Sequence, residues 1–246
     1  MEHVPDRFGD RVQIHNTMNQ LYSFVARTKI GQTQNKDDVR RNTVKILHYF
    51  FHEWGGSSLR FLTLPSSFWI GEKYLRHKFK YRDANKPTTV YFVGCEKVWA
   101  LFTLGTINLP DKPGEDSSKC LCVTTHDKFN CQVVYSKNQQ FALFHLDVFE
   151  YMDKTSSTFN CIWLDTTSPI TFIQDKILNI KKVIRPGQPV AVCITILKGR
   201  DKYDPGCRIT LMDKLIRQVD PRLTRISVME YYDTSPMMHF IYTKEM

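Results

Sequence analysis

The sequence predicts an α/β domain in which a mostly parallel sheet ends in an antiparallel hairpin. From residue 58 onward, short apolar runs typical of strands alternate with amphipathic segments typical of helices, which is the pattern of βα repeats. The last two apolar runs, residues 225–232 and 237–244, are joined by the turn-forming stretch 233–236. We therefore expect residues 58–246 to form one α/β domain, preceded by an N-terminal helical extension over residues 1–57.

Two amphipathic helices are expected in this extension. The first covers residues 15–30, and the polar stretch 31–38 is predicted to be a loop. Either Asp37 or Asp38 can cap the second helix, which ends before Gly55. Its apolar face has residues at helical spacing, namely Val44, Leu47, Phe51 and Trp54, and Lys45 is offset from that stripe.

The expected elements of the domain follow in regular order. The strands cover residues 59–65, 88–96, 141–147, 159–165 and 190–197, and the last follows a Pro-Gly turn at 186–187. The helices cover residues 67–79, 97–106, 148–155, 171–184 and 207–219. Residues 109–119 read as a surface loop. Residues 119–125 and 131–136 form either a short hairpin or one strand with an irregular link.

Three of the predicted strands end in a carboxylate, at Glu96, Asp147 and Asp165. Ligands of open parallel sheets bind beyond the carboxyl ends of the strands, where these three acids would face one crevice. Any one of them could instead cap the helix that follows it. Packing does not require three such acids together, so the pattern favours a binding site.

The charge of the chain favours a polyanionic partner. Its 34 Lys and Arg residues against 25 Asp and Glu give a net charge of +9 and a pI near 9.2. Basic surfaces bind nucleic acid through release of counterions, so nucleic acid is the first partner to consider.

The cysteines and the hydropathy pattern predict a cytoplasmic or nuclear protein. Cys95, Cys161 and Cys193 lie in apolar strand-like runs, as expected for free thiols in a reducing compartment. We find no signal-peptide pattern and no apolar run long enough for a membrane span. A zinc site is not expected, because the spacing of the nearest candidates does not fit the usual knuckle. Those candidates are Cys120, Cys122, His126 and Cys131.

From Ser58 to the end, the order of elements resembles the class I S-adenosylmethionine-dependent methyltransferase fold. That resemblance implies a Rossmann-like, seven-stranded sheet whose last strand is inserted antiparallel through a terminal hairpin, and S-adenosylmethionine as cofactor. It implies that Glu96 binds the ribose hydroxyls and that Asp147 binds the adenine amino group, with Val148 and Phe149 beside the ring. By the same resemblance, the turn at Pro65 and Ser66 faces the methionine moiety, and Asp165 lies beside the methyl group and the substrate.

Two features refine the resemblance. The family's first motif is usually glycine-rich, whereas residues 62–67 of this chain, Leu-Thr-Leu-Pro-Ser-Ser, contain no glycine. Ribose 2′-O-methyltransferases use a Lys-Asp-Lys-Glu set, and residues of the right type lie in the corresponding regions: Lys45, Asp165, Lys198 and Glu230. We therefore expect a methyltransferase that acts on nucleic acid, RNA rather than DNA, with the ribose 2′-hydroxyl as one candidate acceptor. The alternative is a catalytically inactive methyltransferase-like fold that binds nucleic acid or serves as an assembly subunit with a protein partner.

Overall fold

A computed structural model describes residues 33–54, 58–65, 70–80, 89–98, 102, 120–121, 132–135, 141–198 and 204–246. Several sequence-based expectations lie outside these residues. They are the helix at 15–30, the surface loop at 109–119, Ser66, and three of the four residues considered for zinc, Cys122, His126 and Cys131.

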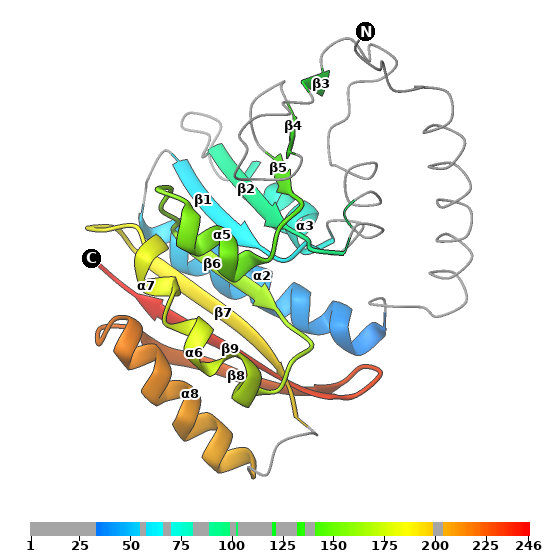
Figure 1. Cartoon of the computed structure of the whole chain (residues 1–246), viewed down its shortest axis with the longest axis vertical. Coiled ribbons are helices and arrows are strands. Elements are labelled where there is room, and N and C mark those ends of the chain that lie inside the picture. Colours follow the sequence, from blue (N-terminus) through cyan, green and yellow to red (C-terminus); the bar gives the residue numbers. More distant parts are fainter. Residues whose placement is uncertain are drawn as a thin grey trace, which may run out of the picture.

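Within this part of the chain a single mixed sheet has the strand order β3-β4-β5-β2-β1-β6-β7-β9-β8 (Figure 1). Strands β5, β2, β1, β6 and β7 are parallel, and β9 lies antiparallel between β7 and β8. The seven strands from β5 to β8 confirm the predicted topology. The short hairpin of β3 and β4, one of the two expected alternatives, extends the outer edge of β5. The strands are β1 Ser58–Thr63, β2 Thr89–Cys95, β3 Cys120–Leu121, β4 Gln132–Tyr135, β5 Phe141–Phe144, β6 Cys161–Asp165, β7 Val190–Leu197, β8 Thr224–Tyr232 and β9 Pro236–Lys244.

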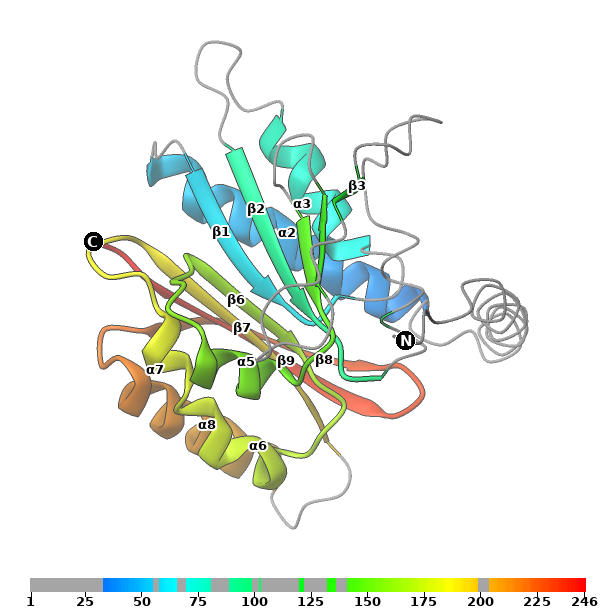
Figure 2. The same ribbon diagram turned by 45° about the horizontal axis from the view of Figure 1, so that its top comes forward.

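Helices cover both faces of this sheet, as parallel sheets require (Figures 1 and 2). One face packs against α2 (Gln34–Trp54) and α3 (Ile70–Lys80). The other packs against α5 (Val148–Lys154), α6 (Ile170–Ile177), α7 (Ile180–Val183) and α8 (Pro205–Val219). None of the helices in the described segments is both long enough and apolar enough to cross a membrane.

Helix α2 begins earlier than the sequence predicted. Capping by Asp37 or Asp38 was wrong, because the helix starts at Gln34 and the Thr33 hydroxyl accepts a hydrogen bond from the Lys36 amide at 3.3 Å. Asp37 instead accepts a hydrogen bond from Arg41 Nε at 2.6 Å. Lys36 therefore lies in the first turn of α2, where the helical backbone sets the direction in which its side chain projects.

Helix α2 packs directly on the sheet through its apolar face. Val44, Leu47 and Phe51 are buried together with residues of β1 and α3. The Phe51 ring meets the Phe61 ring of β1 edge-on, with centroids 6.1 Å apart. This contact begins a row of aromatic rings that continues across β2 and β5 through Phe92 and Phe141. The position of α2 is thus tied to the centre of the sheet.

The turn that precedes β7 depends on a glycine. Gly187 has φ +63°, and a Cβ added there would meet no atom within 4 Å. The cost of Gly187→Ala should therefore be conformational alone, about 1 kcal/mol of unfolding free energy. Urea denaturation measures this loss, with Lys181→Ala, at an exposed position of the nearby α7, as a control that should change little. An unchanged midpoint for Gly187→Ala would contradict the left-handed conformation.

Candidate functional site

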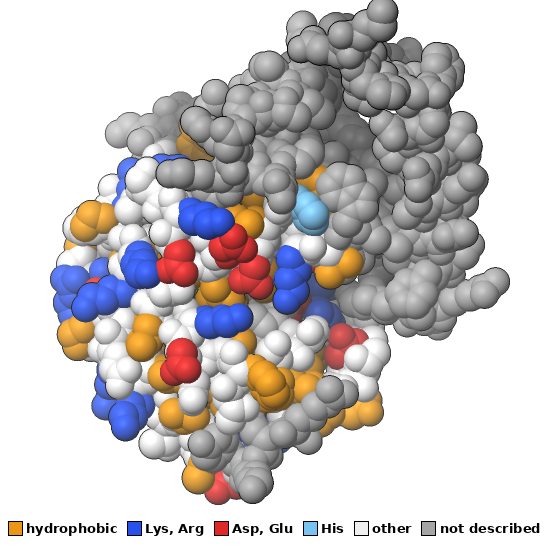
Figure 3. Space-filling model, viewed as in Figure 1, with side chains coloured by type: hydrophobic (Ala, Val, Ile, Leu, Met, Phe, Trp, Pro, Cys, Tyr) orange, Lys and Arg blue, Asp and Glu red, His pale blue; other side chains and the backbone are white. Residues whose placement is uncertain are grey.

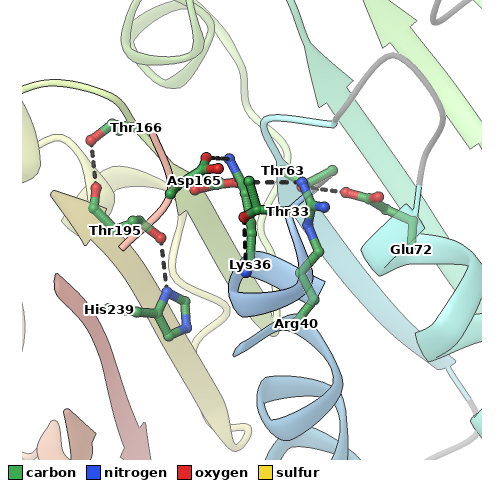
Figure 4. A network of polar contacts seen from close by, with 10 residues as sticks. Thr33, Lys36, Arg40, Thr63, Glu72, Asp165, Thr166, Thr195 and His239 are labelled. Atoms are coloured by element: carbon green, nitrogen blue, oxygen red, sulfur yellow. Dashed lines mark hydrogen bonds and ion pairs between the residues drawn. The ribbon is translucent and has the colours of Figure 1, made fainter. Parts of the chain in front are cut away.

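The centre of the candidate site is the carboxylate of Asp165, the last residue of β6. Lys36 Nζ, from the first turn of α2, lies 3.0 Å from Asp165 Oδ2, and Arg40 Nη2 lies 3.9 Å from the same oxygen (Figure 4). The side chains of Lys36 and Asp165 are only 11% and 19% exposed, so water screens this ion pair weakly.

Two cations keep the Asp165 carboxylate ionised, and two buried carboxylate oxygens at this place accept no hydrogen bond from the described part of the chain. Burial alone raises the pKa of Asp165, but the charges of Lys36 and Arg40 outweigh it and leave the pKa below its ordinary value. Asp233, in the β8–β9 turn, lies 3.9 Å from Lys36 Nζ. Asp165 Oδ1 and Asp233 Oδ1 are both buried, and neither has a hydrogen-bond partner among the described residues. Buried polar atoms are normally satisfied, so these two oxygens mark a place for a donor group.

Behind Asp165, buried hydrogen bonds hold α2 to the sheet. The His239 ring of β9 contacts the Thr195 hydroxyl at 2.8 Å and the Thr43 hydroxyl at 3.0 Å, and so links β9 to β7 and α2. Thr166 donates its hydroxyl hydrogen to the Thr195 carbonyl at 2.5 Å. These contacts fix both Asp165 and the helix that brings Lys36 to it (Figure 4).

A further acid, Glu72 of α3, lies near the end of β1. The Thr63 hydroxyl donates to Glu72 Oε1 at 2.7 Å, and burial raises the pKa of Glu72. Sequence analysis did not identify Glu72 as a site residue. Pro65, which follows β1, is buried at the same end of the sheet.

Glu96 and Asp147 lie together at the ends of β2 and β5, on the other side of β1 from Asp165. Glu96 Oε1 accepts from the Val98 amide at 2.8 Å, and burial raises the pKa of Glu96. Asp147 is the N-cap of α5 and accepts from the Phe149 amide through Oδ1 at 2.9 Å. Lys97 Nζ lies 3.8 Å from Asp147 Oδ2. Each acid thus caps its own loop or helix with one oxygen, the simpler of the two interpretations of strand-end acids.

Val148 and Phe149 follow Asp147 in the chain and are buried. Their exposed fractions are 3% and 7%, because the first turn of α5 packs into the core of the sheet. Both side chains thus belong to the apolar core on the α5 side of the sheet.

The structure also brings Lys198 and Glu230 together, because their side chains form an ion pair. Lys198 directly follows β7, and Glu230 lies in β8 opposite Met238 of β9. Met238 belongs to the core on the α6 and α8 side, whereas Asp165 is bound by α2 on the opposite side. The second lysine and the glutamate thus approach the sheet edge from the other face.

Lys45 does not lie near Asp165. It lines an apolar groove of about 570 Å³ together with Pro189, which precedes β7, and Met246. This groove is at the amino end of the parallel strands, whereas Asp165 is at the carboxyl end. Lys36 is the lysine of α2 that lies beside Asp165. The signal for it was Thr33, a good capping residue that starts the helix early enough to include Lys36.

Comparison with known proteins identifies the fold. No family model matches the chain, and no curated protein matches it. Among solved structures, a candidate class I S-adenosylmethionine-dependent methyltransferase from Listeria monocytogenes superposes with a TM-score of 0.55 at 8% identity, over 95% of this chain and 69% of that one. A candidate methyltransferase from Escherichia coli gives a TM-score of 0.50 at 10% identity, over 88% and 89% of the two chains. The S-adenosylmethionine-dependent methyltransferase from Agrobacterium tumefaciens gives 0.50 at 10% identity, over 87% and 63%. This chain therefore has the class I S-adenosylmethionine-dependent methyltransferase fold.

Proposed function

We propose that this protein is an S-adenosylmethionine-dependent methyltransferase acting on nucleic acid, RNA rather than DNA. The observation that carries the proposal is the Lys36–Asp165 ion pair of 3.0 Å at the carboxyl end of β6, with Asp165 Oδ1 buried and unpartnered among the described residues. The net charge of +9 favours a polyanionic substrate, and a reducing cytoplasm or nucleus suits the free, buried thiols of Cys161 and Cys193.

The chemistry that we assign to Asp165 is orientation of the acceptor. A ribose 2′-hydroxyl is the candidate acceptor, and its hydrogen would be donated to Asp165 Oδ1. The hydroxyl oxygen would bond to the methyl carbon as the bond from that carbon to the sulfonium sulfur breaks, so that S-adenosylhomocysteine would leave and the hydroxyl proton would pass to the Asp165 carboxylate. Lys36 and Arg40 hold that carboxylate ionised and in place beforehand.

The other two members of the proposed Lys-Asp-Lys-Glu set are Lys198 and Glu230. They lie on the face of the sheet opposite Asp165. Their ion pair places a cation after β7, where it would meet a phosphate of the substrate strand. In this proposal Lys36, rather than Lys45, is the first lysine of the set.

The residues at the ends of β2 and β5 fit the cofactor. S-adenosylmethionine, when bound, supplies an electrophilic methyl group. Asp147 Oδ2 lies 3.8 Å from Lys97 Nζ, beyond hydrogen-bond range, and the Lys97 side chain is 70% exposed, so a ligand amino group can take its place. Glu96 would accept from ribose hydroxyls, and Pro65 would lie nearest the methionine moiety, with Ser66 beside it in the sequence.

Two substitutions at Asp147 separate cofactor binding from helix capping. Asp147→Asn keeps an oxygen for the Phe149 amide but replaces the second oxygen with an NH₂ donor, which opposes the adenine amino group. Asp147→Ala removes both. Both variants should bind S-adenosylmethionine and S-adenosylhomocysteine at least about tenfold more weakly in calorimetric titration. Only Asp147→Ala should also lose stability, by about 1 kcal/mol.

The second candidate is a catalytically inactive fold that binds nucleic acid or a protein partner. Two observations favour it: the turn after β1 has no glycine, and both Glu96 and Asp147 are engaged in caps. In that case the wild-type protein binds no S-adenosylmethionine, and nucleic-acid binding is the same in wild type and Asp147→Asn. Cofactor binding that is lost in Asp147→Asn would reject this candidate.

A further inference from the structure

We propose that Phe172 and Tyr232 form a base-stacking platform for single-stranded RNA at the edge of the candidate site. This inference rests on the proposed function and adds how the substrate strand is held. Its basis is the placement of two exposed aromatic rings beside the Asp165 loop, on elements far apart in sequence.

Both rings are unusually exposed for their size. Phe172, in the first turn of α6, is 73% exposed, and Tyr232, the last residue of β8, is 61% exposed. Ile170, Ile173 and Ile177 bury the opposite side of α6, so packing does not require an aromatic residue at position 172. Exposed apolar side chains mark a binding surface when they lie close together, so the relative placement of Phe172 and Tyr232 carries the argument.

Backbone hydrogen bonds connect the two rings through the candidate site. The Phe172 amide bonds to the Pro169 carbonyl, and the neighbouring Ser168 carbonyl accepts from Leu197 at the end of β7. The next amide, that of Lys198, bonds to the Pro236 carbonyl, and Pro236 pairs with Tyr232. The path from β7 to β8 crosses two strand spacings, roughly 10 Å. A strand with bases about 3.4 Å apart would need at least about three or four nucleotides to join the two rings, because Phe172 lies beyond β7 on α6.

The two rings also belong to the same side of the sheet. Side chains alternate along a strand, so Tyr232 faces the same side as Glu230, which pairs with Met238 in the α6 and α8 core. Phe172 comes from α6 itself. On this side hydrophobic side chains reach the surface among both basic and acidic side chains (Figure 3). The ion pair joins Lys198, which follows β7, to Glu230, two residues before Tyr232 in β8.

This combination fits a single strand of nucleic acid. Exposed rings offer stacking faces to unpaired bases, whereas the bases of a duplex are already stacked on one another. A nearby lysine and a net charge of +9 supply the attraction to phosphates. RNA strands are commonly recognised in this way, with splayed bases stacked on aromatic side chains.

The test measures binding of an unstructured single-stranded RNA of about ten nucleotides by fluorescence anisotropy, without cofactor. Phe172→Ala and Tyr232→Ala should each weaken binding by at least about fivefold, and Phe172→Tyr should retain it, because stacking contributes about 1–3 kcal/mol per base. The salt dependence of binding should not change, because neither ring carries charge. Tyr49→Ala is the matched control: Tyr49 is also 73% exposed, but lies in the groove at the amino end of the strands. Thermal melting checks that every variant folds.

The outcomes separate this inference from the proposed function. Alanine variants that bind RNA as the wild type does would overturn the platform, even if S-adenosylmethionine binds. Loss of RNA binding in these variants, without cofactor binding by the wild type, would support the platform and reject the enzyme. Failure of the wild-type protein to bind single-stranded RNA would overturn the platform. So would a dimer, seen by sedimentation, that Phe172→Ala dissociates, because the rings would then be a contact between two copies of the chain.

Discussion

Replacing Lys36 with methionine should lower the rate of methyl transfer to RNA by about 100-fold or more, the usual effect of losing a group that acts on proton transfer. Methionine keeps much of the side-chain volume but removes the ammonium group that lies 3.0 Å from Asp165 Oδ2. Arg40 Nη2, 3.9 Å from Asp165 Oδ2, then remains beside the carboxylate. The measurement is the initial rate of transfer of a radiolabelled methyl group from S-adenosylmethionine to RNA.

The matched control is Lys45→Met in the same helix. Lys45 is exposed and lies at the amino end of the strands, so its rate should stay within about twofold of the wild type, in line with the small effects of surface substitutions. The reverse result, with Lys45→Met inactive and Lys36→Met active, would favour the assignment made from sequence. Equal activity of both variants would show that neither lysine takes part in the reaction.

Lys36→Met should also change how the stability of the protein depends on pH. Because the pKa of Asp165 is below its ordinary value in the folded protein, its ion pairing stabilises the fold above the ordinary value of about 3.9. This contribution disappears as the pH falls through the lower, folded-state pKa. In Lys36→Met, the charge of Lys36 no longer counteracts the effect of burial, so the pKa of Asp165 rises. The difference in unfolding free energy between wild type and variant should therefore be larger at pH 7 than at pH 3 by urea denaturation, and a constant difference would contradict this account.

The order of strands and helices could be predicted from the sequence because the lengths of the apolar runs, the amphipathic segments and the turn residues all indicated the same elements. Apolar runs of strand length alternated with amphipathic segments, and the turn at residues 233–236 defined the final hairpin, which the structure confirms as β8 and β9. The insertion of β9 between β7 and β8 came from the family resemblance. Periodicity within a strand does not specify which strand lies beside it.

The candidate site was predicted less completely, for two physical reasons. Helix starts are set by local capping, and the difference between a cap at Thr33 and a cap at Asp37 decided whether Lys36 belonged to a helix or a loop. The pairing of Lys36 with Asp165 joins positions 129 residues apart (165 − 36), which no local pattern encodes. The sequence showed that Glu96 and Asp147 end their strands. It did not decide between ligand binding and capping, and the structure shows that both acids make capping hydrogen bonds.

Phe51→Ala should cost about 3–5 kcal/mol of unfolding free energy, because it empties a fully buried ring position in the core of the sheet. The ring packs against Phe61 with centroids 6.1 Å apart and against Phe50 at 4.9 Å, so its removal takes away aromatic contacts as well as volume. Urea denaturation measures the loss. Tyr49→Ala, two residues away in the same helix and 73% exposed, should change stability by less than about 0.5 kcal/mol.

This substitution also tests whether α2 is part of the site. Phe51 and Lys36 are 15 residues apart on one helix (51 − 36), or about 22 Å, so Phe51 cannot touch the reacting groups. If α2 must be docked for Lys36 to reach Asp165, Phe51→Ala should lower the rate of methyl transfer even at temperatures where the sheet remains folded. Hydrogen exchange should then show faster exchange in α2 than in β6 and β7. A variant that loses stability uniformly, with an unchanged rate below its melting transition, would mean that the hydrogen bonds of Thr43 with His239 are enough to hold the first turn of α2 in place.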